Sequence, residues 1–168
     1  MIKHLCILPL VYFVFIMGCT YEKPFAQPDN SLIDEKLLGH WKFSEENKNG
    51  SKIEMLIMKY SDTEYLVKYI TGDNPFYFRA YNVSIGDITA VQVQWIGLEK
   101  GILEDNNRKY NLLKYTLERD SLEIRFINDL LISKDIRSSS TLRNKVLENS
   151  KNPELFNTPG KFERVKKL

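Results

Sequence analysis

Cysteine and histidine, the residue types that form disulfides and most zinc sites, are scarce in this chain. Its 168 residues include two cysteines, Cys6 and Cys19, and two histidines, His4 and His40. If residues 1–18 are removed, one cysteine and one histidine remain. An internal disulfide is then excluded, and so is a zinc site with three or four His and Cys ligands. We therefore expect no metal or cofactor, and a fold that depends on its apolar core.

An excess of charge of one sign is also missing. Residues 19–168 carry 23 Lys and Arg against 22 Asp and Glu, because the N-terminal segment contains Lys3 and no acidic residue. Nucleic-acid-binding domains have a clear basic excess, and so do segments that bind anionic lipid headgroups. The composition therefore argues against a nucleic-acid partner and against electrostatic binding to a membrane.

Sequence motifs for catalysis are missing too. The chain has no glycine-rich phosphate loop, no His-Glu-x-x-His and no Gly-x-Ser-x-Gly. A catalytic triad would have to use His40, for which a surface position at a strand end is the simpler interpretation. Adjacent carboxylates occur at 45–46 and 104–105, but neighbouring side chains in turns point apart, whereas a glycosidase needs two carboxylates that face one bond. We expect a protein that is not an enzyme.

A long hydrophobic run occurs at the N-terminus. Residues 1–4 include a lysine, residues 5–16 are almost entirely apolar, and Gly18-Cys19 follows shortly after. The run is shorter than the roughly 20 apolar residues of a membrane-spanning helix. A basic start, a short apolar run and a small residue before a cleavage point are typical of an export signal. Residues 1–18 are therefore predicted to be a signal peptide.

The end of this run, Ile16-Met17-Gly18-Cys19, resembles the lipobox of bacterial lipoproteins. The resemblance implies cleavage before Cys19 and attachment of acyl chains such as palmitate to it, and several chains anchor a protein firmly. Thr20 stands where many inner-membrane lipoproteins have aspartate, which indicates the outer membrane of a bacterial cell envelope. An ordinary cleaved secretory signal and a retained signal anchor are the alternatives.

Residues 19–33 contain two prolines and show no apolar periodicity. This composition is typical of a linker, and twelve such residues reach roughly 35–40 Å when extended. We expect a lipidated tether that holds the domain clear of the headgroups. The remaining residues, 34–168, have the length of one domain.

From Lys36 onward, apolar and polar residues mostly alternate, which is the period of β-strands. The clearest case is 90–95, where Val91, Val93 and Trp95 are separated by glutamines. Seven strands are predicted before any helix, at residues 40–44, 53–60, 65–69, 76–85, 90–95, 110–118 and 122–126. A helix over 141–149, preceded by three serines that favour capping, and a final strand over 161–166 complete the pattern.

Short turns join most of these strands, so consecutive strands should be antiparallel neighbours. An open meander would leave two exposed edges, and closure into a barrel removes them. We predict a mainly β fold, an antiparallel up-and-down meander of about eight strands closed as a barrel, with one late helix before the closing strand. A two-sheet sandwich is the rival architecture.

Gly39-His40-Trp41 opens the first predicted strand and resembles the Gly-x-Trp signature of the lipocalins and the wider calycin group. The resemblance implies a glycine at a tight start, a tryptophan that plugs the barrel base, and an arginine of the last strand over its ring, for which Arg164 is the natural candidate. The chain lacks the helix pair that fatty-acid-binding proteins insert after the first strand. The layout is also similar to that of small bacterial lipocalin-like lipoproteins.

A lipocalin-like barrel implies binding of a small hydrophobic or amphipathic ligand. The candidate ligand-binding residues are aromatic and methionine side chains of the strands, namely Met55, Met58, Tyr65, Tyr69, Tyr81 and Trp95. The same side chains could instead fill the core. The alternative is then a non-catalytic lipoprotein that docks on an envelope protein, with the connector 97–109 and the helix as contact surfaces. An empty interior would favour a ligand, and a filled one with an exposed apolar patch would favour a protein partner.

Overall fold

The computed structural model describes residues 20–44 and 52–168. The predicted signal peptide, the predicted lipid acceptor Cys19 and the carboxylate pair at 45–46 lie outside the described residues. Every strand and helix predicted from the sequence lies within the described residues. The predicted turn between the first two strands does not.

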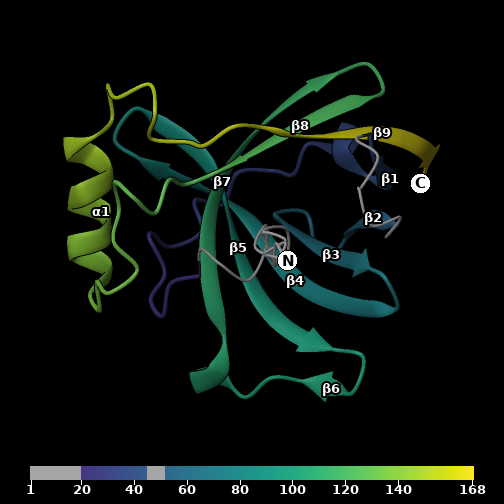
Figure 1. Cartoon of the computed structure of the whole chain (residues 1–168), viewed down its shortest axis with the longest axis horizontal. Coiled ribbons are helices and arrows are strands. Elements are labelled where there is room, and N and C mark those ends of the chain that lie inside the picture. Colours follow the sequence, from purple (N-terminus) through teal and green to yellow (C-terminus); the bar gives the residue numbers. More distant parts are fainter. Residues whose placement is uncertain (1–19, 45–51) are drawn as a thin grey trace, which may run out of the picture.

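Eight antiparallel strands form a closed barrel (Figure 1). In the order around the ring they are β1 (Gly39–Phe43), β2 (Ile53–Lys59), β3 (Glu64–Thr71), β4 (Asn74–Ile85), β5 (Ile88–Leu98), β7 (Lys109–Glu118), β8 (Ser121–Phe126) and β9 (Gly160–Lys167). The ring closes because β9 pairs with β1. A two-residue strand, β6 (Gly101–Ile102), lies outside the ring and pairs with the end of β5. The predicted barrel is confirmed, and continuous pairing around the ring excludes the sandwich.

Among the described residues there is one α-helix, α1 (Ser139–Glu148), which precedes the last strand and lies beside the barrel at the left of Figure 1. Ser138 caps it, because its hydroxyl oxygen accepts a hydrogen bond from the backbone N–H of Thr141. Two short 3₁₀ helices, η1 (Glu35–Leu37) and η2 (Asp105–Asn107), precede β1 and β7. The helix predicted at 141–149 is thus confirmed, with its start two residues earlier.

The strands run alternately between two ends of the barrel. At the end that we call the base, η1 leads into β1, and short turns join β2 to β3, β4 to β5 and β7 to β8. At the other, upper end lie the β3–β4 turn, the connection from β5 through β6 and η2 to β7, and the exit toward α1. The base and the upper end are therefore built from different kinds of segment.

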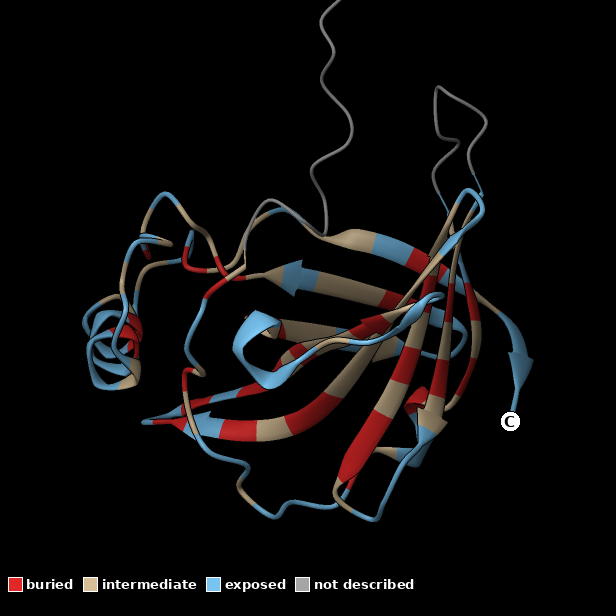
Figure 2. Cartoon of the chain, turned by 90° about the horizontal axis from the view of Figure 1, so that it is seen from below, coloured by how far each residue is buried: buried red, intermediate tan, exposed pale blue. Residues whose placement is uncertain are grey.

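Inward-facing side chains of all eight strands form one apolar cluster, the barrel core. Buried and less buried positions alternate along the strands, as Figure 2 shows. The buried members include Ile33 and Leu37 from the segment before β1, and Trp41, Met55, Ile57, Tyr65, Val67, Tyr69, Ala80, Val91, Leu113, Leu122 and Phe162. This alternation is the period of two that predicted the strands.

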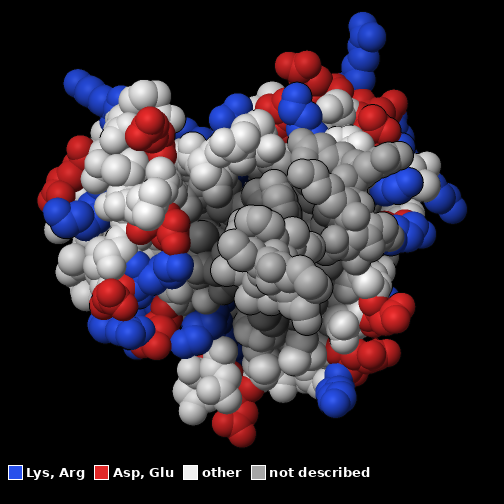
Figure 3. Space-filling view, viewed as in Figure 1, with Lys and Arg blue, Asp and Glu red and all other residues white. Residues whose placement is uncertain are grey.

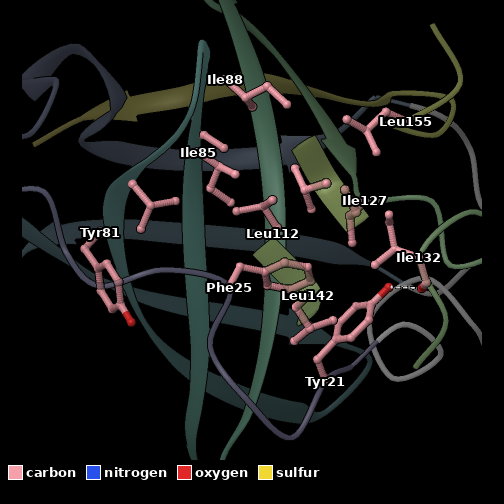
Figure 4. Close-up of a cluster of buried hydrophobic side chains, with 13 residues drawn as sticks. Tyr21, Phe25, Tyr81, Ile85, Ile88, Leu112, Ile127, Ile132, Leu142 and Leu155 are labelled. Atoms are coloured by element: carbon pink, nitrogen blue, oxygen red, sulfur yellow. Dashed lines mark hydrogen bonds between the residues drawn. The ribbon is translucent and has the colours of Figure 1, made fainter. Parts of the chain in front are cut away.

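A second apolar cluster, the outer core, lies on the outside of β4, β5 and β7 (Figure 4). The strands contribute outward-facing residues such as Val83, Ile88 and Leu112. Leu142 and Val146 of α1 cover them, together with Ile127, Ile132 and Leu155 from the segments that flank the helix and Tyr21 and Phe25 from the N-terminal segment. The barrel wall is therefore buried on both faces in this region.

The N-terminal segment differs from the tether that we expected. Tyr21 and Phe25 are 0% and 1% exposed, and Ile33 is buried in the barrel core. The prediction of an extended tether over residues 19–33 is therefore wrong for the described part of that range. Aromatic side chains gain several kcal/mol by burial, and two of them bind the segment to the outer core.

Candidate functional site

Trp41 closes the base of the barrel. Its side chain is fully buried, and its indole N–H donates to the backbone oxygen of Leu37 over 2.9 Å. Arg164 of β9 lies over the ring, with its guanidinium carbon 4.0 Å from the ring centre. The contact expected between these two residues is present, and it fills the base from the first and last strands.

The guanidinium of Arg164 also holds η1 in place. It donates to the backbone oxygens of Lys36 and Leu38 over 2.7 and 3.0 Å, and to a carboxylate oxygen of Asp120 over 2.9 Å. Its side chain is only 6% exposed although Asp120 is at the surface. Such charge-assisted bonds are stronger than neutral ones, so Arg164 ties η1, β9 and the β7–β8 turn together.

Gly39 is required at the start of β1. Its φ is +147°, a conformation that residues with a Cβ rarely adopt. A Cβ at this position would lie 2.5 Å from the backbone oxygen of Lys166 and 2.9 Å from Nη1 of Arg164. The glycine therefore allows β1 to approach β9 closely enough for the contact between Arg164 and Trp41.

Three of the six predicted ligand-binding residues lie in the barrel core, namely Met55, Tyr65 and Tyr69. Tyr65 is near the base, where its hydroxyl oxygen accepts a hydrogen bond from the backbone N–H of Asp34 over 2.6 Å. Burial raises the pKa of both tyrosines, that of Tyr69 to about 12. Both phenols are therefore neutral at physiological pH, and they suit the interior of an apolar barrel.

Trp95 lies at the upper end and is half-buried. Its ring centre is 6.0 Å from that of Phe76, and its indole N–H donates to the backbone oxygen of Gly97 over 2.9 Å. The neighbouring barrel-core residues nearest this end are also partly exposed, and they are Phe43, Ile53, Phe78, Val93 and Phe126. The base is thus plugged, whereas the upper end presents aromatic surface to solvent.

Met58 and Tyr81 do not face the interior, and these two predictions are corrected. Met58 alternates with Ile57 along β2, which directs it to the outside. Tyr81 belongs to the outer core, where its hydroxyl oxygen accepts a hydrogen bond from the side-chain amide of Gln92. Because β4 is apolar on both faces, the alternation of its residues does not show which face Tyr81 belongs to.

A polar hollow that the sequence did not indicate lies on the outer wall, with a volume of about 420 Å³. Residues of the N-terminal segment, β4, β5, η2 and β7 line it, and they are Gln27, Pro28, Arg79, Tyr81, Gln94, Asp105, Arg108 and Tyr110. Both arginines have carboxylate partners, Glu64 for Arg79 and Asp105 for Arg108. A second hollow of about 230 Å³ lies between residues 24–27 and the start of α1. Neither is lined by the barrel core.

The remaining candidate groups have ordinary surface partners. His40 lies 3.1 Å from a carboxylate oxygen of Glu54, and Lys52 lies 2.6 Å from the other. The hydrogen bond from Lys52 is the main cause that lowers the pKa of Glu54. Burial acts in the opposite direction, and the hydrogen bond from His40 lowers the pKa further. Asp105 of the 104–105 pair binds Arg108. Within 20–44 and 52–168, no group of three or more His, Cys, Asp or Glu could hold a metal ion.

The face shown in Figure 3 carries Lys and Arg intermixed with Asp and Glu, as the balanced composition leads one to expect. In the described ranges, none of the helices has the length and apolar character needed to cross a membrane. Comparisons with models of protein families, with curated proteins and with solved structures found no match.

Proposed function

We propose that this chain is a lipocalin-like lipoprotein of the bacterial cell envelope, anchored in the outer membrane through acyl chains on Cys19. We further propose that its barrel binds a small hydrophobic or amphipathic ligand at the upper end. The observation that carries the ligand proposal is the contrast between the two ends. Trp41 is completely buried at the base, whereas Phe76, Phe78 and Trp95 are partly exposed at the upper end.

The residues of the upper end suit an amphipathic molecule. Aromatic rings offer flat apolar surface at a small cost in side-chain entropy. Tyr69 lies beside Phe76 in the β3–β4 register and places a neutral phenol among these rings. Because Trp41, Leu37 and Leu122 fill the base, a ligand would lie near the upper end rather than deep in the barrel.

The two tryptophans of the chain make this proposal testable, because Trp95 lies at the upper end and Trp41 at the base. Bromine atoms quench tryptophan fluorescence on close contact. We would titrate the mature chain, residues 19–168 without the acyl chains, with fatty acids and lysophospholipids brominated along the acyl chain. We expect saturable quenching of Trp95 and unchanged emission from Trp41.

The matched control is Trp95→Phe, which leaves Trp41 as the reporter. This variant should show little quenching at ligand concentrations that saturate the parent chain. Saturable quenching in the variant as strong as in the parent would place the ligand at the base and contradict the proposed site. If no brominated lipid quenches either protein, the ligand proposal fails.

The second candidate function, a non-catalytic role in docking on an envelope protein, is favoured by a different observation. The lower part of the barrel is filled, and Ile102 of β6 is 82% exposed on the projecting β5–β6 hairpin. Binding residues are often found on loops that a rigid scaffold positions. Cross-linking in intact cells from Ile102→Cys, compared with Ser61→Cys in the β2–β3 turn, would test this alternative.

A further inference from the structure

We infer that the lipid anchor holds the barrel directly on the membrane surface, with the flank beside the start of β7 facing the bilayer. This inference rests on the proposed acylation of Cys19. It goes beyond it by stating how the domain is oriented and which surface meets the lipid.

Tyr21, two residues after the acceptor cysteine, is fixed to the barrel wall. Its backbone N–H and C=O both pair with Tyr110 of β7, each over 2.8 Å. Its hydroxyl donates to the backbone oxygen of Ile132 over 2.7 Å, a bond visible in Figure 4. The ring is 0% exposed and packs edge-on against Phe25, with ring centres 4.7 Å apart. Tyr21 thus acts as a clamp at the beginning of the described chain.

A buried glutamine of β5 secures the next residues of the clamp. The side-chain oxygen of Gln92 accepts hydrogen bonds from the backbone N–H groups of Phe25 and Ala26, over 2.6 and 3.2 Å. Its amide nitrogen donates to the backbone oxygen of Ala26 and to the Tyr81 hydroxyl. Gln92 is 0% exposed beneath this segment, and release of the segment would break three of its four hydrogen bonds.

Covalent geometry then limits the distance between anchor and barrel. Consecutive Cα atoms are about 3.8 Å apart, so the Cα of Cys19 lies within about 7–8 Å of the Cα of Tyr21. A chain with a twelve-residue tether could instead move roughly 35–40 Å from its anchor. The acyl chains are therefore attached almost to the barrel wall, and the domain cannot rise clear of the headgroups.

The surface around the clamp carries an exposed leucine and two basic side chains. Leu130, two residues before the carbonyl that binds Tyr21, is 91% exposed. Lys109 and Arg137 both pair with Glu22, at 3.3 and 2.6 Å from the same carboxylate oxygen. A leucine can enter the headgroup boundary while basic side chains stay at its polar level. The occupant that we assign to this flank is the lipid bilayer.

The ring order identifies the side that should point away from the membrane. β2 lies across the barrel from β7, with three strands between them in either direction. Ser61 follows β2 in an exposed turn. Labels at Leu130 and Ser61 should therefore differ strongly in their distance from the bilayer.

The experiment uses the acylated full chain with a single new cysteine, Leu130→Cys or Ser61→Cys, since Cys19 is blocked by acylation. Each is labelled with a fluorophore and placed in vesicles of phosphatidylethanolamine and phosphatidylglycerol that contain lipids with a spin-labelled headgroup as the quencher. We expect at least threefold stronger quenching at position 130 than at position 61. Equal quenching at the two positions would overturn the inference.

A linker variant tests whether the short attachment is the cause. Insertion of twelve Gly and Ser residues between Thr20 and Tyr21 keeps the clamp and the barrel and lengthens only the attachment. The difference between positions 130 and 61 should then fall to less than half. If it stays unchanged, the short attachment does not orient the domain and the inference is wrong.

Incorporation of labelled palmitate separates this inference from the proposal on which it rests. If palmitate is absent from the parent chain, or persists after Cys19→Ser, the acylation proposal fails. If palmitate is present and depends on Cys19 while quenching is equal at the two labels, acylation stands and the orientation fails.

Discussion

The guanidinium of Arg164 lies over the ring of Trp41 at 4.0 Å, and this contact joins the last strand of the barrel to the first. The two residues are also opposite each other in the β1–β9 register. Because β9 completes the ring, the contact forms only when the barrel has closed. It therefore couples closure of the sheet to burial of the plug at the base.

This coupling can be measured with Trp41→Phe, Arg164→Met and the double variant. We expect Arg164→Met to cost about 2–3 kcal/mol in the free energy of unfolding, because the backbone oxygens that accept from Arg164 lose charged donors. The coupling energy between the two positions should be about 0.5–2 kcal/mol. Urea unfolding of the four proteins measures it, and strictly additive losses would show that the stacked geometry contributes no stability.

Gly39→Ala should destabilise the barrel more than the same change at Gly101. Both glycines have a similar positive φ, +147° and +144°, but a Cβ meets nothing within 4 Å at Gly101 and meets Lys166 at Gly39. Gly101→Ala therefore measures backbone strain, about 1–3 kcal/mol. Gly39→Ala adds a steric cost of about 1–3 kcal/mol. Equal losses in urea unfolding would mean that β1 and β9 separate without penalty.

Gln92→Leu should loosen the N-terminal clamp, because the backbone N–H groups of Phe25 and Ala26 would lose their acceptor. We expect a loss of about 2–4 kcal/mol and faster amide hydrogen exchange at these two residues. Gln94→Leu is the matched control on the same strand, since its amide donates one hydrogen bond, to the Tyr110 hydroxyl. Unchanged exchange in Gln92→Leu would show that the apolar contacts alone hold the segment.

Tyr69 should contribute to alkaline unfolding. Burial raises its pKa from 10.0 to about 12, so the folded state favours the neutral phenol. Its stabilising contribution is complete below pH 10 and is lost as the pH rises from 10 through 12. Tyr69→Phe should therefore flatten this part of the stability curve, measured by thermal unfolding at a series of pH values. An unchanged slope between pH 10 and 12 would contradict this prediction.

Most of the barrel could be predicted from local pattern. In β2, Ile53, Met55 and Ile57 alternate with polar or outward residues, because a strand with one buried face imposes a period of two. The arrangement of Gly39, Trp41 and Arg164 could be predicted from the Gly-x-Trp motif, because in a closed barrel the last strand pairs with the first.

The sidedness of β4 could not be predicted in the same way. Phe76, Phe78 and Ala80 face the interior, while Tyr81, Val83 and Ile85 face the outer core. A strand that is apolar on both faces has no polar phase to show its direction. The sequence pattern therefore predicts an inward-facing Tyr81, whereas the structure has it in the outer core. The signal that could have corrected it was the apolar character of both faces of the β4–β5 hairpin, which requires a cover on the outside.

By itself, the amino-acid sequence determined the order of the strands, the position of the helix and the glycine that opens β1, because each depends on neighbouring residues or a short spacing. Only the tertiary structure decided where Tyr21 and Phe25 go. A stretch with two prolines and no period looks the same in a free linker as in a segment bound to a surface. The difference comes from an apolar patch on β4, β5 and β7, more than fifty residues away along the chain, whose burial stabilises the bound form.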